Sequence, residues 1–149
     1  MKTFELNIIR HGVLIIASLI AFFSIISALD LVHNVELRIL NAFILFAGVF
    51  SSIKSAKKAD IQGFNFLNGY ATGALVALFT SVGFTGFIQI FLVTHPAFLT
   101  QIQLEEVQGM HMNNWNISAL ILIESLASGI LFTHMSVIWL KKDFAVSVK

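Results

Sequence analysis

The chain has 149 residues, of which 57% are hydrophobic and 11% are charged, whereas soluble domains carry about 25% charged residues. Its formal net charge of +1 offers no electrostatic attraction to nucleic acid, so we expect no nucleic-acid partner. The sequence contains no cysteine, which excludes disulfides, thiolate-bound metals and iron–sulfur clusters. This composition indicates a single-domain integral membrane protein that contacts the lipid bilayer.

Four long apolar runs, separated by short polar segments, fill more than half of the chain. A helix that crosses the hydrocarbon core needs about 20 apolar residues. We therefore predict an all-α membrane protein, an antiparallel bundle of four transmembrane helices at about 9–32, 36–54, 67–94 and 115–141, within one domain that covers residues 1–149. The runs themselves are Gly12–Leu29, Leu37–Ile53, Ala71–Val93 and Ile117–Leu140.

The first two runs each admit an alternative. Gly12–Leu29 is longer than the roughly 7–15 apolar residues of a signal peptide, so we expect a retained helix. Leu37–Ile53 has Arg38 and Asn41 near its start, and its length is close to the lower limit for spanning. The alternative is a re-entrant hairpin, which would place the following lysines on the outer side. We favour a full span, with the Arg38 side chain extended to the outer interface.

Small residues recur at helical spacing in the third and fourth predicted helices. Because residues separated by three or four positions share a helix face, such stripes let membrane helices approach closely. The predicted packing residues are Gly69, Gly73 and Ala77 in the third helix, and Ser125 and Gly129 in the fourth, where Ser118 and Ser136 continue the stripe.

A polar loop of about 95–114 connects these two helices. Pro96 ends the third helix, because proline cannot continue it. Within the loop, Ala97–Val107 has the apolar spacing of a short amphipathic helix lying on the membrane interface.

The basic residues predict the orientation. Eight of the nine Lys and Arg residues fall on one side if all four runs span the membrane, and the exception is Arg38. Short loops rich in Lys and Arg stay in the cytoplasm. We therefore expect both termini to be cytoplasmic, as an even number of spans also requires.

Two short motifs carry a resemblance to a known family. The segment from Lys57-Lys58 through Gly63-Phe64-Asn65-Phe66-Leu67-Asn68-Gly69-Tyr70-Ala71-Thr72-Gly73 resembles the start of the third helix in a family of small four-helix membrane proteins of the Bacteroidota, known as a domain of unknown function. Pro96-Ala97-Phe98 is similar to that family's Pro-x-Phe, although His95 stands where an acidic residue is expected. The resemblance implies a multi-pass protein of the bacterial inner membrane and no particular activity.

Two ionisable residues lie within the fourth predicted helix. Glu124 would lie roughly 10 Å below the outer interface, where an ionised carboxylate costs on the order of 2.5–3.5 kcal/mol. It is either a hydrogen-bonded structural residue or a group that acts in ion movement or partner recognition. His134 faces nearly opposite the small-residue stripe, which predicts contact with lipid or a partner subunit. A rotated helix with His134 bonded to a backbone carbonyl is the alternative.

Polar residues near the outer ends of the four helices form a predicted cluster. Arg38 is the only basic residue on that side, so it is the natural counter-ion for Asp30 or Glu124, since its guanidinium serves two acceptors. In the alternative, Arg38 extends into headgroups and Glu124 stays protonated and alone. The cluster consists of Asp30, Arg38, Asn41, Gln89 and Glu124.

The sequence contains no arrangement typical of catalysis or of cofactor binding. The five histidines lack the spacing of metal or haem ligands, and we find no phosphate-binding loop or nucleophile–base pair. We expect a non-catalytic accessory or scaffolding protein, without cofactor or metal, that packs against other membrane subunits or against its own copies. The alternative is a small oligomeric transporter or channel that uses Glu124.

Overall fold

The structure of the chain is a computed structural model that describes residues 2–29, 35–59, 64–105 and 112–146. The described residues form five helices and no strand, which confirms the predicted all-helical class. The helices are α1 Lys2–Ala28, α2 Val35–Ala59, α3 Phe66–Thr94, α4 Pro96–Glu105 and α5 Asn114–Val146.

Four of these helices are long and apolar enough to cross a membrane, as the four runs predict. The second run, the shortest, belongs to an apolar stretch of 21 helical residues, which is sufficient length for a span. The chain therefore has the architecture of a multi-pass membrane protein. The apolar stretches are Phe4–Ala28, Ile39–Ala59, Phe66–Thr94 and Asn114–Leu140.

Several helices extend beyond the predicted bounds. α1 begins at Lys2 rather than near residue 9, α2 continues to Ala59 rather than 54, and α5 continues to Val146 rather than 141. The predicted bounds followed hydropathy, which marks only the part suited to lipid. The polar flanks contain neither Gly nor Pro, so nothing interrupts the backbone hydrogen bonds there. Residues 30–32, predicted to end the first helix, lie outside the described residues.

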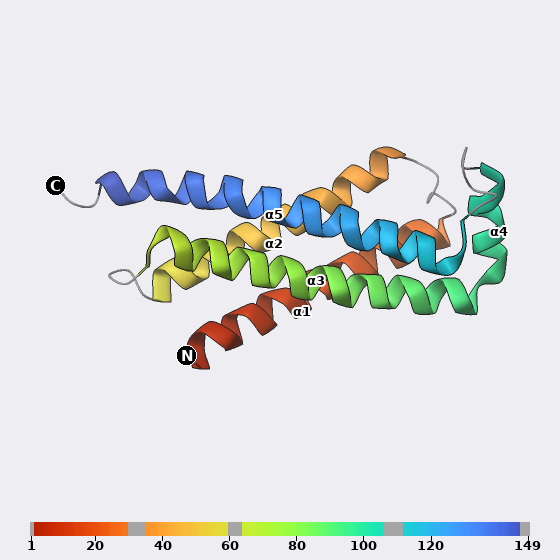
Figure 1. Ribbon diagram of the computed structural model, residues 1–149, viewed down its shortest axis with the longest axis horizontal. Helices are drawn as coiled ribbons and strands as arrows, with labels where there is room; N and C mark the ends of the chain where they lie inside the picture. The colour runs from red at the N-terminus through yellow and green to blue at the C-terminus, as the bar shows by residue number, and fades with distance from the viewer. Residues whose placement is uncertain (1, 30–34, 60–63, 106–111, 147–149) are drawn as a thin grey trace.

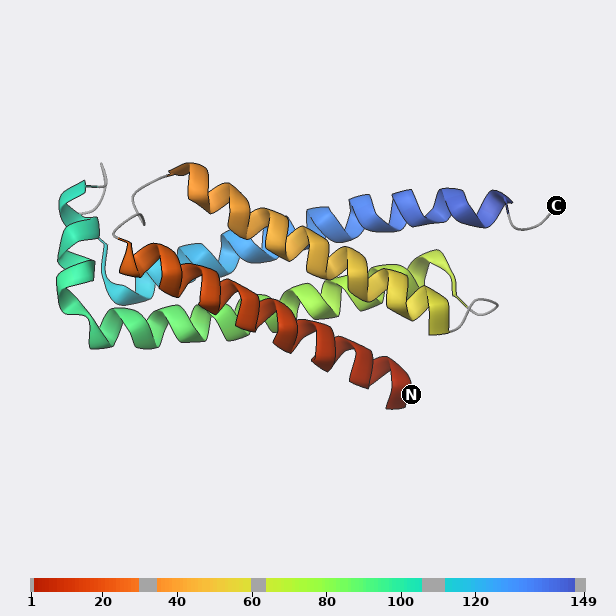
Figure 2. The ribbon, with the colours of Figure 1, turned by 180° about the vertical axis from the view of Figure 1, so that it is seen from behind.

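Consecutive long helices run in alternating directions (Figure 1). The start of α1 and the end of α5 lie at the same end of the molecule as the end of α2 and the start of α3 (Figures 1 and 2). We call this the basic end, because α2 finishes there with Lys54, Lys57 and Lys58. The opposite end, where α4 lies across the long helices, is called the far end.

Helix α3 is central to the packing, since it contacts α1, α2 and α5, and its interface with α5 is the most extensive of all. The most deeply buried apolar side chains include Val49, Ile53 and Val76. Outside this core, large apolar side chains remain exposed, such as Ile90 at 67% and Ile123 at 66%. An apolar exterior over much of the helix length suits lipid contact.

Helix α4 packs on the far end through aromatic side chains. The Phe98 ring lies 6.2 Å from the Phe23 ring and 5.4 Å from the Phe91 ring, both edge-on. Leu104, on the other side of α4, is 81% exposed. The predicted amphipathic helix therefore forms, as Pro96–Glu105. One of its faces, which includes Phe98, packs against the core, and the face with Leu104 points outward.

Candidate functional site

The small-residue stripes meet where α3 and α5 cross. Gly69, Gly73, Ala77 and Gly129 are all buried. A methyl group added at Gly129 would lie 2.5 Å from the Ala77 Cβ, and one added at Gly73 would lie 2.6 Å from a methyl of the α5 residue Thr133. The two backbones thus approach as closely as glycine allows. These residues bring the helices together and supply no chemistry.

Hydroxyl groups accompany this interface. Thr72 donates to the Asn68 carbonyl at 2.7 Å, and Thr133 donates to the Gly129 carbonyl at 2.8 Å. Half-buried Ser125 donates to the Leu122 carbonyl at 3.1 Å. These bonds stay within one helix, so they satisfy the hydroxyls without linking α3 to α5.

Other buried oxygens in the described residues have no hydrogen-bond partner in the protein. Such oxygens are costly in an apolar interior, so they mark places where the bundle is more polar than packing requires. They are Asn41 Oδ1, Thr80 Oγ1, Ser81 Oγ, Thr85 Oγ1 and Ser136 Oγ.

One residue of the predicted polar cluster, Gln89, bonds to a residue from outside the cluster. Gln89 of α3 is half-buried, and its side-chain oxygen accepts a hydrogen bond from the Ser118 hydroxyl of α5. This bond joins the two helices near the far end. Ser118 was predicted only as a packing residue, because sequence spacing does not show which side chain faces it across the interface.

Two further residues of the predicted cluster lie on α2 and α5. Asn41 is half-buried on α2, and Glu124 is exposed on α5. The α2 residue Phe46 packs against Phe132 of α5 with ring centres 5.4 Å apart, so the two helices are neighbours. Asp30 and the Arg38 side chain lie outside the described residues. The pairing of Arg38 with Asp30 or Glu124 therefore stays a prediction.

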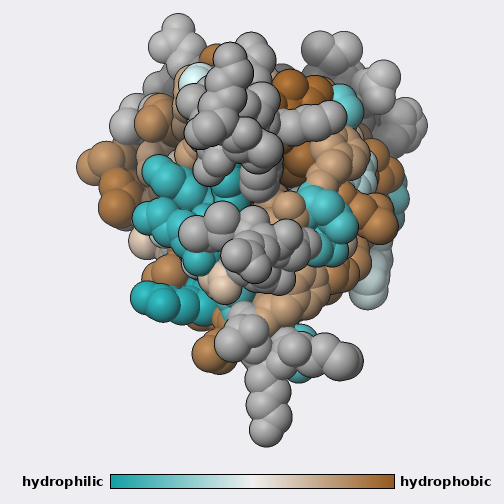
Figure 3. All heavy atoms as spheres, turned by 90° about the vertical axis from the view of Figure 1, so that its left-hand side faces the viewer, coloured by the Kyte–Doolittle hydropathy of each residue, from teal (hydrophilic) through white to brown (hydrophobic). Residues whose placement is uncertain are grey.

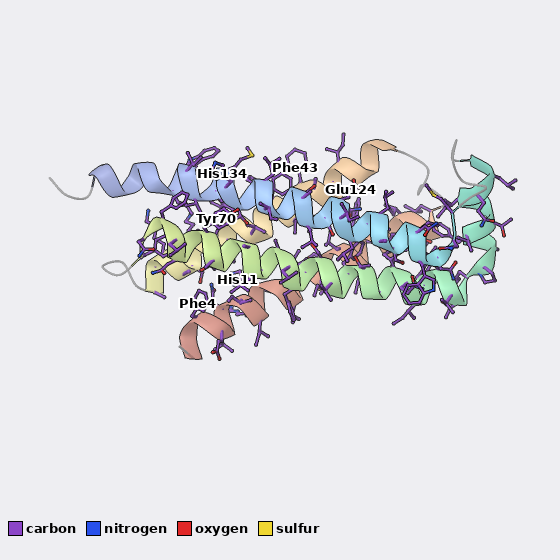
Figure 4. All side chains as sticks on the ribbon, viewed as in Figure 1. Phe4, His11, Phe43, Tyr70, Glu124 and His134 are labelled. Carbon is purple, nitrogen blue, oxygen red and sulfur yellow. The ribbon has the colours of Figure 1, made fainter. Side chains whose placement is uncertain are left out.

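The outer face of α5 carries both ionisable residues of that helix's apolar stretch. Glu124, Ala127, Leu131 and His134 are all exposed. At about 100° per residue, their spacing of three, four and three residues puts them on one face. Figure 4 shows Glu124 and His134 on α5, with His134 pointing away from α3. We call these four residues the α5 outer face.

A second polar site lies at the basic end, between α1 and α2. It is an open cavity on the surface of the protein. Figure 3, a view onto this end, shows hydrophilic side chains gathered on part of the surface. Three of the lining residues are cationic, one is a histidine and two carry hydroxyls. They are Arg10, His11, Leu14, Ser51, Lys54, Ser55 and Lys58.

In the sequence, the basic residues of this cavity predict only which side of the membrane is cytoplasmic. A local signal existed, because Lys54 and Lys58 are four residues apart on one face of α2. Nothing local shows, however, that Arg10 of α1 faces the same space.

Among the described residues, no three His, Asp or Glu side chains gather closely enough to hold a metal ion. Comparison of the chain with models of known protein families, with curated proteins and with solved structures finds no match. The resemblance to the four-helix family of the Bacteroidota therefore remains a hypothesis.

Proposed function

We propose that this protein is a non-catalytic accessory or scaffolding subunit of the bacterial inner membrane, which binds other membrane subunits or its own copies through the α5 outer face. The observation that carries the proposal is the exposure of Glu124 and His134 on one face of a helix long enough to span the membrane. Polar side chains inside the membrane usually face protein or a water-filled cavity rather than lipid.

The α5 outer face also has a shape suited to another helix. Ala127 lies between Glu124 and Leu131 on this face and is exposed. A small residue lets a second helix approach closely, and the Glu124 and His134 side chains are then covered by protein rather than by lipid. The occupant we propose is therefore a transmembrane helix, from another subunit or a second copy.

In the membrane, we propose an antiparallel four-helix bundle with the basic end in the cytoplasm. Arg10, Lys54, Lys57 and Lys58 all lie at that end. The excess of Lys and Arg in short cytoplasmic segments supports this orientation. Helix α4 then lies at the outer surface of the membrane.

A small oligomeric transporter or channel remains the second candidate, and the buried oxygens without partners favour it. Thr80, Ser81 and Thr85 of α3 give the bundle interior a polar character. Glu124 is on the outside of the single bundle, so a pathway that uses it would run between subunits. Ion flux through liposomes that contain only the purified protein would favour this function.

The absence of cysteine allows a direct test of the α5 outer face. A single cysteine at Ala127→Cys is labelled with a photoactivatable maleimide in native membranes, irradiated, and analysed by mass spectrometry. The matched control is Ala21→Cys, an exposed alanine within the α1 apolar stretch. We expect a discrete cross-linked protein from position 127 and none from position 21.

The identity of the cross-linked protein decides between partners: a different membrane protein supports the accessory role, and a second copy supports self-association. Equal cross-linking to abundant membrane proteins from both positions would contradict the proposed interface.

A further inference from the structure

The cavity at the basic end lies beside a set of direct contacts between α1 and α2. The Asn7 side-chain amide of α1 donates to the Ser52 carbonyl of α2 at 3.1 Å. The His11 Nδ1–H donates to the Asn7 carbonyl at 2.9 Å, which holds the ring beside this contact. Ile15 of α1 lies against Gly48 of α2. These contacts set the separation of the two helices beside the cavity.

The charges that line the cavity all have the same sign. Arg10, Lys54 and Lys58 are exposed, and none of the lining residues is acidic. Gathering three cations around one space costs electrostatic free energy unless an anion is close by. The proposed cytoplasmic position of this end explains why it is positively charged. It does not explain why basic side chains from two different helices line the same cavity.

Lys57 shows the contrast. It belongs to the same stretch of α2 as Lys54 and Lys58, yet it does not line the cavity. Its Nζ donates to the Leu140 carbonyl of α5 at 3.0 Å. One lysine of the three therefore links α2 to α5, while the other two face the space beside α1.

The depth of the cavity matches the membrane surface. All the lining residues fall toward the basic ends of the apolar stretches Phe4–Ala28 and Ile39–Ala59, and Lys58 is next to the last residue of α2. Because three of these residues are charged, the cavity belongs at the membrane surface rather than in the hydrocarbon core. Phospholipid headgroups occupy this level, and basic pockets between membrane helices bind anionic headgroups.

We propose that this cavity binds a phosphate group, carried by an anionic phospholipid. The Arg10 guanidinium forms paired hydrogen bonds with phosphate oxygens, and the ammonium groups of Lys54 and Lys58 supply further positive charge. The Ser51 and Ser55 hydroxyls donate hydrogen bonds, and Leu14 lies against the start of an acyl chain. The site involves no residue of α5, so it is independent of the proposed interface there.

The test compares lipid retention between variants. The purified protein is mixed in detergent with phosphatidylglycerol or phosphatidylcholine, and native mass spectrometry measures the affinity for each lipid. The variants are the double substitution Arg10→Gln with Lys54→Gln, and the matched control Lys57→Gln, which removes one charge from the same end without altering the cavity lining. Melting temperatures without added lipid verify that each variant folds.

We expect the wild-type protein to prefer phosphatidylglycerol. Because a basic residue near an anionic membrane surface contributes roughly a fivefold effect on binding, the double variant should bind about 25-fold more weakly. Lys57→Gln should bind within about twofold of the wild type, as expected for a cation held away from the phosphate.

Inorganic phosphate, added as a competitor, distinguishes the sources of the ligand. Displacement of phosphatidylglycerol by millimolar phosphate would assign the site to a soluble phosphate compound, and retention would assign it to lipid. Equal affinity of the wild type for the two lipids, or a loss in Lys57→Gln as large as in the double variant, would overturn the proposal.

Discussion

At the scale of single residues, the glycines of α3 and α5 lie in very different surroundings. A methyl group at Gly129 would meet the Ala77 Cβ at 2.5 Å, and because a Cβ is fixed to its backbone, the two helices would have to move apart. A methyl group at Gly86, which is also within α3, would meet nothing within 4 Å. The same substitution thus has opposite consequences at the two positions.

We predict that Gly129→Ala lowers the free energy of unfolding by about 1–3 kcal/mol, the usual effect of overpacking. Gly86→Ala should raise it by up to about 1 kcal/mol, because alanine favours the helix more than glycine does. Thermal unfolding of the two variants in the same detergent measures both effects. An equal loss of stability in the two variants would show that Gly129 does not set the distance between α3 and α5.

At the scale of elements, α4 is attached to the long helices by the face that carries Phe98. Phe98 contacts the rings of Phe23 and Phe91, which belong to α1 and α3. One side chain of α4 therefore joins two membrane helices near the far end. Leu104 of the same helix is 81% exposed and makes no comparable contribution to the core.

We predict that Phe98→Ala destabilises the protein by about 2 kcal/mol, since it removes a half-buried ring and two edge-on aromatic contacts. Leu104→Ala should change the stability by less than about 0.5 kcal/mol. Thermal unfolding in detergent measures both changes, and limited proteolysis between α4 and α5 reports whether α4 is released. Similar melting temperatures for the two variants would mean that α4 is not anchored by Phe98.

At the scale of the whole molecule, the two ends differ in charge. The basic end carries Arg10, Lys54, Lys57 and Lys58, and the far end is closed by α4, a helix whose described side chains bear no charge. This asymmetry is the basis of the proposed orientation, because positively charged segments are retained in the cytoplasm.

We predict that a reporter active only in the cytoplasm is active when fused after Lys149, and inactive when inserted after Leu104 in α4. Whole-cell reporter activity, normalised to the amount of fusion protein, gives the result. The two fusions control for each other, since both contain all four apolar helices. Activity at Leu104 together with inactivity at Lys149 would reverse the proposed topology.

The sequence alone determined those properties that depend on local hydropathy and helical spacing. These include the all-helical class, the four apolar helices, the amphipathic helix after Pro96 and the stripe through Gly69, Gly73 and Ala77. Each is local, because solvation of a helix face depends only on residues within a few turns. The spacing of His134 to the small-residue stripe of α5 left two orientations open, and the structure shows its side chain exposed.

Only the tertiary structure decided which faces meet. The bond between Gln89 and Ser118 joins positions 29 residues apart, and the cavity combines Arg10 with Lys54 from a different helix. Both arise from helix pairing, which depends on shape complementarity between surfaces that are all similarly apolar. In a membrane helix hydropathy hardly distinguishes one apolar face from another, so the partners of each face emerge only when the helices are packed.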